Sequence, residues 1–263
     1  VGVYTLTYYV SDAQKNAISI KRTVIVRDTK VPSILKLGKA IVDGTTINVQ
    51  IGGVFVDDVY AIDPCNGSIF VSKNPGFNGP VNTNIRATYP VTYRASDPSG
   101  NKATEDGYVL NYRVDDYIAP DIELNTSDTV LHDVNNAYYS RSVTVSDNYY
   151  AKSQLSLTKT GKVDAYTLGT YVETFTCTDG SGNVTTKQRF IKVVDRIAPT
   201  ITAPAISVCI ATPFWAMSGL IVRDNYYSSG DLMPLVKVLG HNVNVMEAGV
   251  YYINYSLVDP SGN

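Results

Sequence analysis

A strand-like segment ending in aspartate recurs four times along the 263-residue chain, and this repeat constrains the fold more than any other feature. The copies are GVYTLTYYVSD, ATYPVTYRASD, GTYVETFTCTD and GVYYINYSLVD, at 2–12, 87–97, 169–179 and 249–259. Successive aspartates lie 85, 82 and 80 residues apart. The chain is therefore predicted to be a tandem array of related modules.

Each copy shows the alternation of a half-buried β-strand. A tyrosine stands eight residues before the aspartate, an aromatic residue four before it and a small or apolar residue two before it. These positions share one face of a strand, so we expect them to point into a core. Glu173 interrupts this row in the third copy, between Tyr171 and Phe175, and the pattern alone does not assign the inward face there.

A short polar turn follows each strand, with the sequence DAQKN, DPSGN, DGSGN or DPSGN. Asp at the first position, Pro at the second and Gly at the fourth are preferred in type I turns, and the glycine can begin a bulge. These segments are therefore predicted to be hairpin turns, with Lys15 replacing glycine in the first. The turn residues are Asp12, Asp97, Gly100, Asn101, Asp179, Gly182, Asn183, Asp259, Gly262 and Asn263.

The strand after each turn ends at DTKVP, DYIAP or DRIAP, where an aspartate precedes proline by four residues. Proline lacks a backbone donor and holds its neighbour extended, so Pro32, Pro120 and Pro199 are predicted to mark short, stiff linkers. The predicted domains are a C-terminal hairpin of a preceding module at 1–30, complete modules at 31–117 and 118–196, and a module lacking its last strand at 197–263. Because the sequence opens within a strand and stops within a turn, we expect a window of a longer protein.

Composition supports an all-β class and removes two kinds of partner. The counts of Tyr 20, Gly 19 and Pro 12 favour strands and turns over helices. Lys and Arg number 22 against 24 Asp and Glu, a net charge of −2, so no basic surface points to nucleic acid or to an anionic membrane. No apolar run is long enough to span a bilayer, and we expect no membrane contact within this segment.

Residues suited to catalysis are sparse. The two histidines, His132 and His241, lie in different modules at non-equivalent places, which argues against a shared active site and predicts no enzymatic role. The three cysteines, Cys65, Cys177 and Cys209, also fall in different modules, so disulfides within a module are excluded and three free thiols are predicted.

Calcium is the one cofactor that the pattern supports, because strand ends bring together the oxygen ligands that hard cations prefer. Acidic residues close the apolar segments VFVDD, VTVSDN and LIVRDN and open the linkers. The alternative is that these are solvated acids, and no Asp-x-Asp-x-Asp-Gly loop is present. The sequence thus predicts no cofactor other than structural calcium, with the candidate ligands Asp57, Asp115, Asp116, Asp147, Asp195 and Asp224.

The segments GVYYINYSLVDPSGN and GTYVETFTCTDGSGN, followed by FIKVVDRIAPTI, resemble the immunoglobulin-like tandem repeats of bacterial surface proteins, including the hyalin-repeat-like family. Those repeats show a Gly-x-Tyr strand, an Asp-x-x-Gly-Asn turn and a Val-x-Asp-x-x-x-Pro exit, and the match covers the whole chain. The resemblance implies an all-β fold of tandem immunoglobulin-like β-sandwich repeats of about 80–85 residues. It also implies an extracellular location at a bacterial cell surface.

The resulting functional hypothesis is a non-catalytic structural or adhesive segment of a large surface or fibre protein, acting as a semi-rigid spacer or filament. Two alternatives stay open: carbohydrate-binding accessory repeats of a secreted enzyme, and a component of an S-layer lattice. The expected partners are adjacent repeats of the same chain, further copies in a filament or lattice, and surface glycans. Trp215, in the segment PFWAM, is expected to pack in a core rather than to form a sugar platform.

Overall fold

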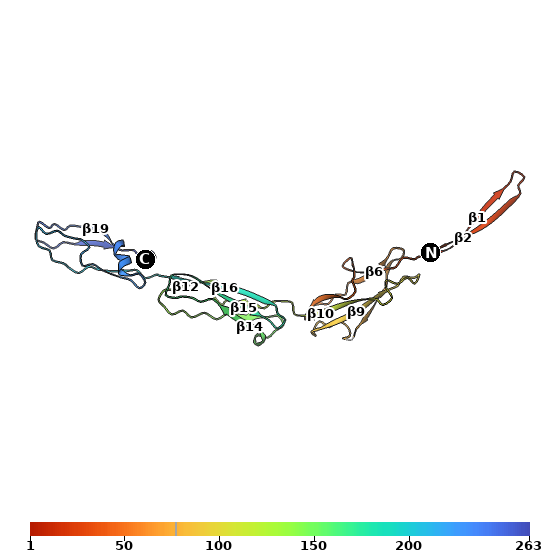
Figure 1. The fold of residues 1–263 in the computed structure, drawn as a ribbon, viewed down its shortest axis with the longest axis horizontal. Coiled ribbons are helices and arrows are strands. Elements are labelled where there is room, and N and C mark those ends of the chain that lie inside the picture. Colours follow the sequence, from red (N-terminus) through yellow and green to blue (C-terminus); the bar gives the residue numbers. More distant parts are fainter. Residues whose placement is uncertain (77) are drawn as a thin grey trace. The chain divides into compact units, whose positions relative to one another are not determined.

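The computed structural model describes residues 1–76 and 78–263, which form two compact units, Val1–Ile118 and Ala119–Asn263. Both units consist almost entirely of β-strands (Figure 1). The predicted all-β class of tandem sandwich repeats is confirmed.

Two four-stranded sheets form the body of the first unit. One sheet has the order β4-β3-β6-β7 and the other β5-β10-β9-β8. All neighbouring pairs are antiparallel except β5 and β10, which run parallel. The strands are β3 (Ser33–Lys36), β4 (Lys39–Ala40), β5 (Thr45–Gln50), β6 (Val59–Asp63), β7 (Gly67–Ile69), β8 (Val71–Pro75), β9 (Ala87–Ala95) and β10 (Tyr108–Asp115).

The core of this sandwich contains the inward row that the alternation predicts. Tyr89, Val91, Tyr93 and Ala95 of β9 are all buried, and they pack in one cluster with residues of both sheets. The Tyr93 hydroxyl lies 2.8 Å from that of Tyr112 on β10, so the two buried polar groups satisfy each other. Burial raises the pKa of Tyr112 to about 12.

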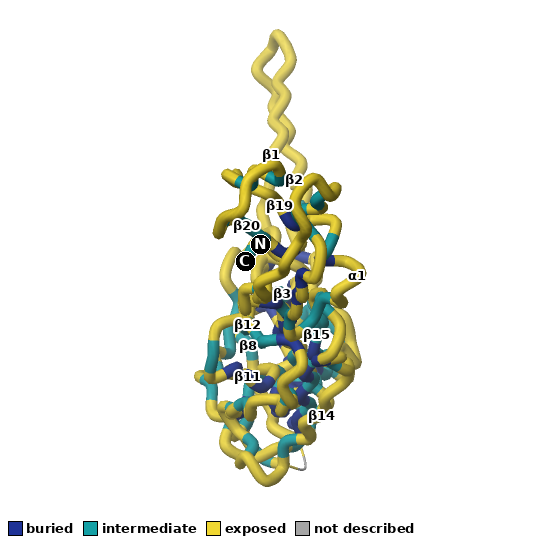
Figure 2. The backbone as a smooth tube through the Cα atoms, turned by 90° about the vertical axis from the view of Figure 1, so that its left-hand side faces the viewer, coloured by how far each residue is buried: buried dark blue, intermediate teal, exposed yellow. Residues whose placement is uncertain are grey.

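A two-stranded hairpin precedes this sandwich and forms the rest of the first unit. β1 (Gly2–Ser11) pairs antiparallel with β2 (Ala17–Val26) in continuous register. The row that is buried in β9 is exposed in β1, as the exposed colouring of the hairpin shows (Figure 2). The turn between the strands carries Lys15 with a positive φ of 67°.

The second unit contains two further modules. The first has a two-stranded sheet, β11-β13, and a four-stranded sheet, β12-β16-β15-β14, in which β12 and β16 run parallel. The second has the pairs β17-β18 and β19-β20 and two short helices. The elements are β11 (Asp121–Glu123), β12 (Thr129–Asp133), β13 (Thr144–Ser146), η1 (Lys152–Gln154), β14 (Ser156–Thr160), β15 (Gly169–Thr178), β16 (Val184–Val194), β17 (Thr200–Thr202), β18 (Ile221–Arg223), α1 (Ser229–Leu232), η2 (Met233–Leu235), β19 (Lys237–His241) and β20 (Ile253–Ser256).

The tyrosine eight residues before each turn aspartate makes a recurring local bond. The hydroxyls of Tyr89, Tyr171 and Tyr251 donate to the carbonyl oxygen four residues upstream, at 3.1, 2.9 and 3.1 Å. A tyrosine bonded back to the nearby backbone in this way is a hallmark of immunoglobulin-like sandwiches. This bond explains the tyrosine at the same position of the strand in these three copies.

Glu173 does face inward, and the protein neutralises it. The side chain is 1% exposed, with Lys159 Nζ 2.9 Å and Arg189 Nη1 3.5 Å from its carboxylate oxygens. Tyr138 donates a hydrogen bond to the same carboxylate at 3.1 Å. Burial opposes ionisation, but hydrogen bonds from Lys159, Ser140 and Tyr138 together hold the pKa of Glu173 below its ordinary value.

Candidate metal centre

Each of the four hairpin turns is closed by its first and last residues. In the final turn, Asp259 N donates to Asn263 O at 3.1 Å, while Asn263 N and Nδ2 donate to the two Asp259 carboxylate oxygens at 2.9 and 3.0 Å. The same three bonds close the turns at 12–16, 97–101 and 179–183. The aspartate and asparagine are therefore fixed before any ligand arrives.

The asparagine amide of a turn also reaches the linker that leads into its own module. Asn101 Nδ2 donates to the carbonyl oxygen of Asp28, and Asn263 Nδ2 donates to that of Asp195, both at 3.2 Å. The asparagine near the end of a module therefore binds the linker aspartate that precedes the same module. This contact places the linker carboxylate beside the turn carboxylate.

A third carboxylate comes from a tight loop that follows the first sheet pair of each module. Asp63, Asp147 and Asp224 end or follow β6, β13 and β18, and each turns its Oδ1 back onto the backbone. That oxygen accepts from the N–H groups two and three residues further on, at 2.8–3.0 Å. Such Asx loops leave the other carboxylate oxygen free to point elsewhere.

In the second unit these features meet in a group of three carboxylates. Asp195, Asp224 and Asp259 each contribute one oxygen, and the three oxygens lie within 4.8 Å of one another. Asp195 is 6% exposed and Asp259 is 4% exposed. Asp195 Oδ2 and Asp224 Oδ2 are buried and have no hydrogen-bond partner among the described residues.

In the first unit a related group contains Asp28, Asp63 and Cys65, again with ligand atoms within 4.8 Å. Asn66 fills part of this site, because its Nδ2 donates to Asp28 at 2.7 Å and to Asp63 at 3.2 Å. The hydrogen bond to Asp28 raises the pKa of the Cys65 thiol, which therefore stays protonated. Sulfur is also a poor ligand for hard cations such as calcium, which prefer oxygen.

The remaining calcium candidates have other partners. Asp57 Oδ2 pairs with Lys73 Nζ at 2.9 Å and lies before β6 rather than at the end of a strand. Its neighbour Asp58 pairs with Lys36. The carboxylate that takes the strand-end position in this module is Asp63.

Asp115 and Asp116, at the end of β10, differ from each other. Asp115 is neutralised by Arg86 and Arg113, with nitrogen–oxygen distances of 2.6 and 3.1 Å. Asp116 is 1% exposed, and its Oδ1 accepts from Gln50 Nε2 at 2.8 Å. Asp116 Oδ1 also accepts from Ile118 N at 3.2 Å, the same local bond that Asp195 makes with Ile197 N.

Of the five carboxylates in the two groups, Asp195 and Asp224 are predicted calcium ligands and the other three are not. Asp28 and Asp259 were assigned only to a linker and a turn, and Asp63 was not singled out. The signal for Asp63 was the position of YAID directly before a polar loop, as in the other two modules. The absence of the Tyr-Tyr pair that follows Asp147 and Asp224 hid this equivalence.

The structure also shows the burial of the linker prolines, the three cysteines and Trp215. Pro32 and Pro120 are buried and Pro199 is half-buried. All three cysteines are free thiols, and burial raises the pKa of Cys177, which occupies the small inward position of β15. Trp215 is 74% exposed, so the expectation that it packs in a core is wrong.

The two modules of the second unit meet through an aromatic contact next to the 195–259 group. Tyr226, two residues after Asp224, packs against the buried cluster of Val134, Ile191 and Val193 in the preceding module. Its hydroxyl lies 3.5 Å from Leu168 N. The loop that carries a cluster carboxylate therefore also fills a gap in the neighbouring module.

Two polar contacts reinforce this junction. Asn135 Nδ2 donates to the carbonyl oxygen of Asn225 at 2.6 Å. Arg196, next to Asp195, makes a bidentate pair with Asp133 at 2.6 and 2.9 Å and holds the pKa of that carboxyl below its ordinary value. The first contact holds the loop that follows Asp224, and the second holds the linker at the residue after Asp195.

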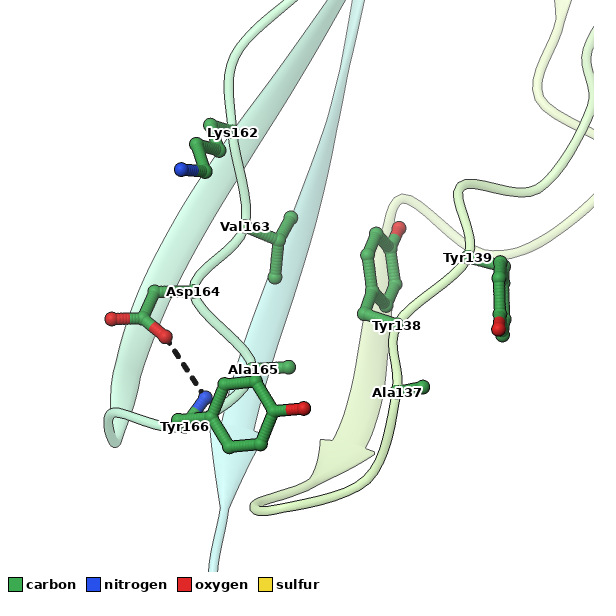
Figure 3. Close-up of a pocket in the computed structure, with 8 residues that line it drawn as sticks. All are labelled: Ala137, Tyr138, Tyr139, Lys162, Val163, Asp164, Ala165 and Tyr166. Atoms are coloured by element: carbon green, nitrogen blue, oxygen red, sulfur yellow. Dashed lines mark hydrogen bonds between the residues drawn. The ribbon is translucent and has the colours of Figure 1, made fainter.

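A pocket of about 630 Å³ lies between the segments 137–139 and 162–166 of the second unit (Figure 3). Asp164 is its one carboxylate, and both its oxygens are engaged, by Tyr166 N and by Thr167 Oγ1 at 2.9 Å each. Those bonds lower the pKa of Asp164. His132 and His241 do not line this pocket, and His132 Nε2 lies 3.0 Å from Asn136 O.

Comparison with known proteins gives distant relatives. No protein-family model matches the chain. An uncharacterised 81.3 kDa protein of Acholeplasma phage L2 is 30% identical over 226 residues, covering 80% of this chain and 29% of the relative. Hyalin of Strongylocentrotus purpuratus is 28% identical over 286 residues, covering 100% of this chain and 22% of the relative. The chain thus spans less than a third of either relative.

Solved structures with partial likeness include a protocadherin and a desmocollin. Protocadherin gammaB7 EC3-6 has a TM-score of 0.30 at 14% identity, over 92% of this chain and 73% of that one. The human desmocollin-1 ectodomain has a TM-score of 0.24 at 12% identity, over 80% and 50%. In the described part of the chain, no helix has the length and apolar character needed to cross a membrane. The similarity to hyalin extends over the whole of the present chain. Neither of the two sequence relatives is a bacterial protein.

Proposed function

We propose that the chain is a non-catalytic, tension-bearing spacer segment of an extracellular repeat protein, with a bacterial surface or fibre as its setting. The observation that carries this proposal is the parallel pairing of an early strand with the last strand of a module. β5 pairs with β10 over six residue pairs, from Thr45–Leu110 to Gln50–Asp115. β12 pairs with β16 over five residue pairs.

Parallel pairing determines how such a module responds to tension. When the chain is pulled from both sides of a module, the early strand is drawn one way and the last strand the other, along their common axis. All hydrogen bonds between the two strands are then loaded together in shear, rather than one at a time from an end. A module built in this way resists extension along the chain.

The contacts at the junction of the second unit serve the same role. Tyr226 and the Arg196–Asp133 pair tie consecutive modules to each other, and the linker itself is only a few residues long. Short proline-containing linkers are stiffer than Gly/Ser linkers of equal length. The similarity to hyalin supports the extracellular repeat setting.

Single-molecule force spectroscopy on the whole chain tests this role. Cysteine handles at the two termini, with the exposed Cys65 and Cys209 replaced by serine, place the β5–β10 pair in shear. Handles at the exposed positions Val42 and Asp106, near the amino ends of β5 and β10, pull the same pair apart from one end. We expect the shear geometry to require a clearly higher unfolding force, and equal forces would contradict the proposal.

A further inference from the structure

We propose that Asp195, Asp224 and Asp259 form a binding site for a divalent cation of the calcium class at the entrance to the last module. The site uses three carboxylates that come from three separate parts of the chain: the end of β16, the loop after β18 and the turn after β20. This inference is independent of the tension-bearing role, because it concerns occupancy of one site and not the mechanics of the strands.

The spacing of the carboxylates fits one ion. Calcium binds oxygen at about 2.3–2.6 Å, so two ligands of the same ion are at most about 5 Å apart. One oxygen from each of the three residues lies within 4.8 Å of the other two. The donor set contains no nitrogen or sulfur, which favours calcium over zinc.

The hydrogen-bond pattern supplies a second, independent reason. Asp195 Oδ1 accepts from Ile197 N at 3.2 Å, and Asp224 Oδ1 accepts from the backbone of its own loop. Their Oδ2 atoms are buried with no donor among the described residues. Buried carboxylate oxygens are almost always satisfied, so a pair of unsatisfied ones beside a third carboxylate calls for a missing positive charge.

The protein does not supply that charge in the part of the chain that the structure describes. The ion pairs of the second unit use Arg189 and Lys159 for Glu173, Lys187 for Asp121 and Arg196 for Asp133. Arg196 is adjacent to Asp195 in sequence but turns to the exposed Asp133 instead. The three carboxylates therefore face one another with no basic side chain between them.

The site is also rigid before binding. Asn263 holds both oxygens of Asp259 and at the same time the carbonyl of Asp195, so the turn and the linker are one hydrogen-bonded unit. Asp224 is fixed by its Asx loop, and Tyr226 of that loop packs on the preceding module. A bound cation would join all three and so couple the linker, the turn and the intermodule contact.

The test is titration of the chelator-treated chain with CaCl₂, followed by calorimetry and by thermal unfolding. We expect saturable binding and a rise in Tm of roughly 5 °C at calcium concentrations well above Kd. Asp224→Asn should remove one equivalent of bound calcium. Asp121→Asn, at an exposed carboxylate on β11, is the matched control and should bind like the wild type.

Unfolding in chelator separates a cation ligand from a purely structural residue. If Asp224 is a cation ligand, the three carboxylates repel one another without the ion, and Asp224→Asn should unfold at the same Tm as the wild type or higher. If Asp224 is needed only for hydrogen bonding, Asp224→Asn should lower Tm. Should Asp224→Asn fail to fold, Asp195→Asn provides the same comparison. No heat of binding and no Tm change in millimolar CaCl₂, or an unchanged stoichiometry in the folded variant, would overturn the inference.

Discussion

The two carboxylate groups start from the same repeat and reach different electrostatic solutions. In the 28–65 group an amide and a protonated thiol surround the acids, since Asn66 donates to Asp28 and Asp63 and Cys65 lies beside Asp28. In the 195–259 group the third member is a carboxylate rather than a thiol, and the Oδ2 atoms of both Asp195 and Asp224 have no donor among the described residues. In the 28–65 group only Asp63 Oδ2 lacks a donor among those residues. The amide of Asn66 thus satisfies one linker carboxylate oxygen, Asp28 Oδ2, whose counterpart in the other group, Asp195 Oδ2, has no donor among the described residues.

Glu173 is a third kind of buried carboxylate, because its charge is balanced by the side chains of Lys159 and Arg189. Arg189→Met should therefore have the largest effect, with a loss of about 3–5 kcal/mol in the unfolding free energy of the second unit, as expected when one member of a buried pair is removed. Denaturant unfolding measures this loss. The exposed pair offers a control: Lys187→Met should cost less than about 1 kcal/mol. Equal effects for the two variants would mean that burial of the pair has no energetic weight.

Removing the amide donor tests whether Asn66 does stand in for a cation. Asn66→Ala leaves Asp28 Oδ2 without its 2.7 Å donor, and we expect a loss of about 1–3 kcal/mol in the first unit. Urea denaturation gives the value, and Asn84→Ala, in an exposed loop of the same unit, should change stability by less than about 0.5 kcal/mol. If calcium restores the stability of Asn66→Ala, the ion replaces the amide donor, and Asn66 does occupy the position of a cation. If neither variant differs from the wild type, the amide is not part of the cluster energetics.

The smallest expected effect is a gain of function in the first unit. Cys65→Asp replaces the thiol of the 28–65 group by a third carboxylate, and we expect a calcium-dependent stabilisation of about 1.4 kcal/mol at ten times Kd. Thermal unfolding with and without CaCl₂ measures it. Cys65→Ser keeps the site uncharged and should show no such dependence. A calcium response in the serine variant would show that the third carboxylate is not what distinguishes the two groups.

Much of the fold could be predicted from local patterns. The strand alternation identified the buried row of Tyr89, Val91, Tyr93 and Ala95, because period-2 burial leaves a direct trace in sequence. The all-β class followed from the same strands and their turns. Glu173 could not be assigned in this way, since its inward position depends on Arg189 and Lys159, which lie on other strands.

The metal centre could be predicted only in part from the sequence, again because its members come from distant parts of the chain. Asp195 and Asp224 stood out as strand-end acids, but their grouping with Asp259 depends on how the last turn folds back onto the linker. Asp57 was chosen over Asp63 because the apolar segment before it looked like a strand, whereas β6 begins at Val59. Trp215 was expected inside because aromatic residues usually are, and its 74% exposure is a tertiary outcome that no local pattern encodes.

The hairpin turns have one further consequence for how such a chain can vary. At the fourth turn position an added side chain would meet nothing within 4 Å at Gly100, Gly182 and Gly262, so only the left-handed backbone favours glycine there. Lys15 occupies that conformation in the first turn, at a strain of about 1–2 kcal/mol. Each module therefore presents an open tip where chemical identity can change without disturbing the core. Along a long array these tips would form a regularly spaced row of positions free to diversify.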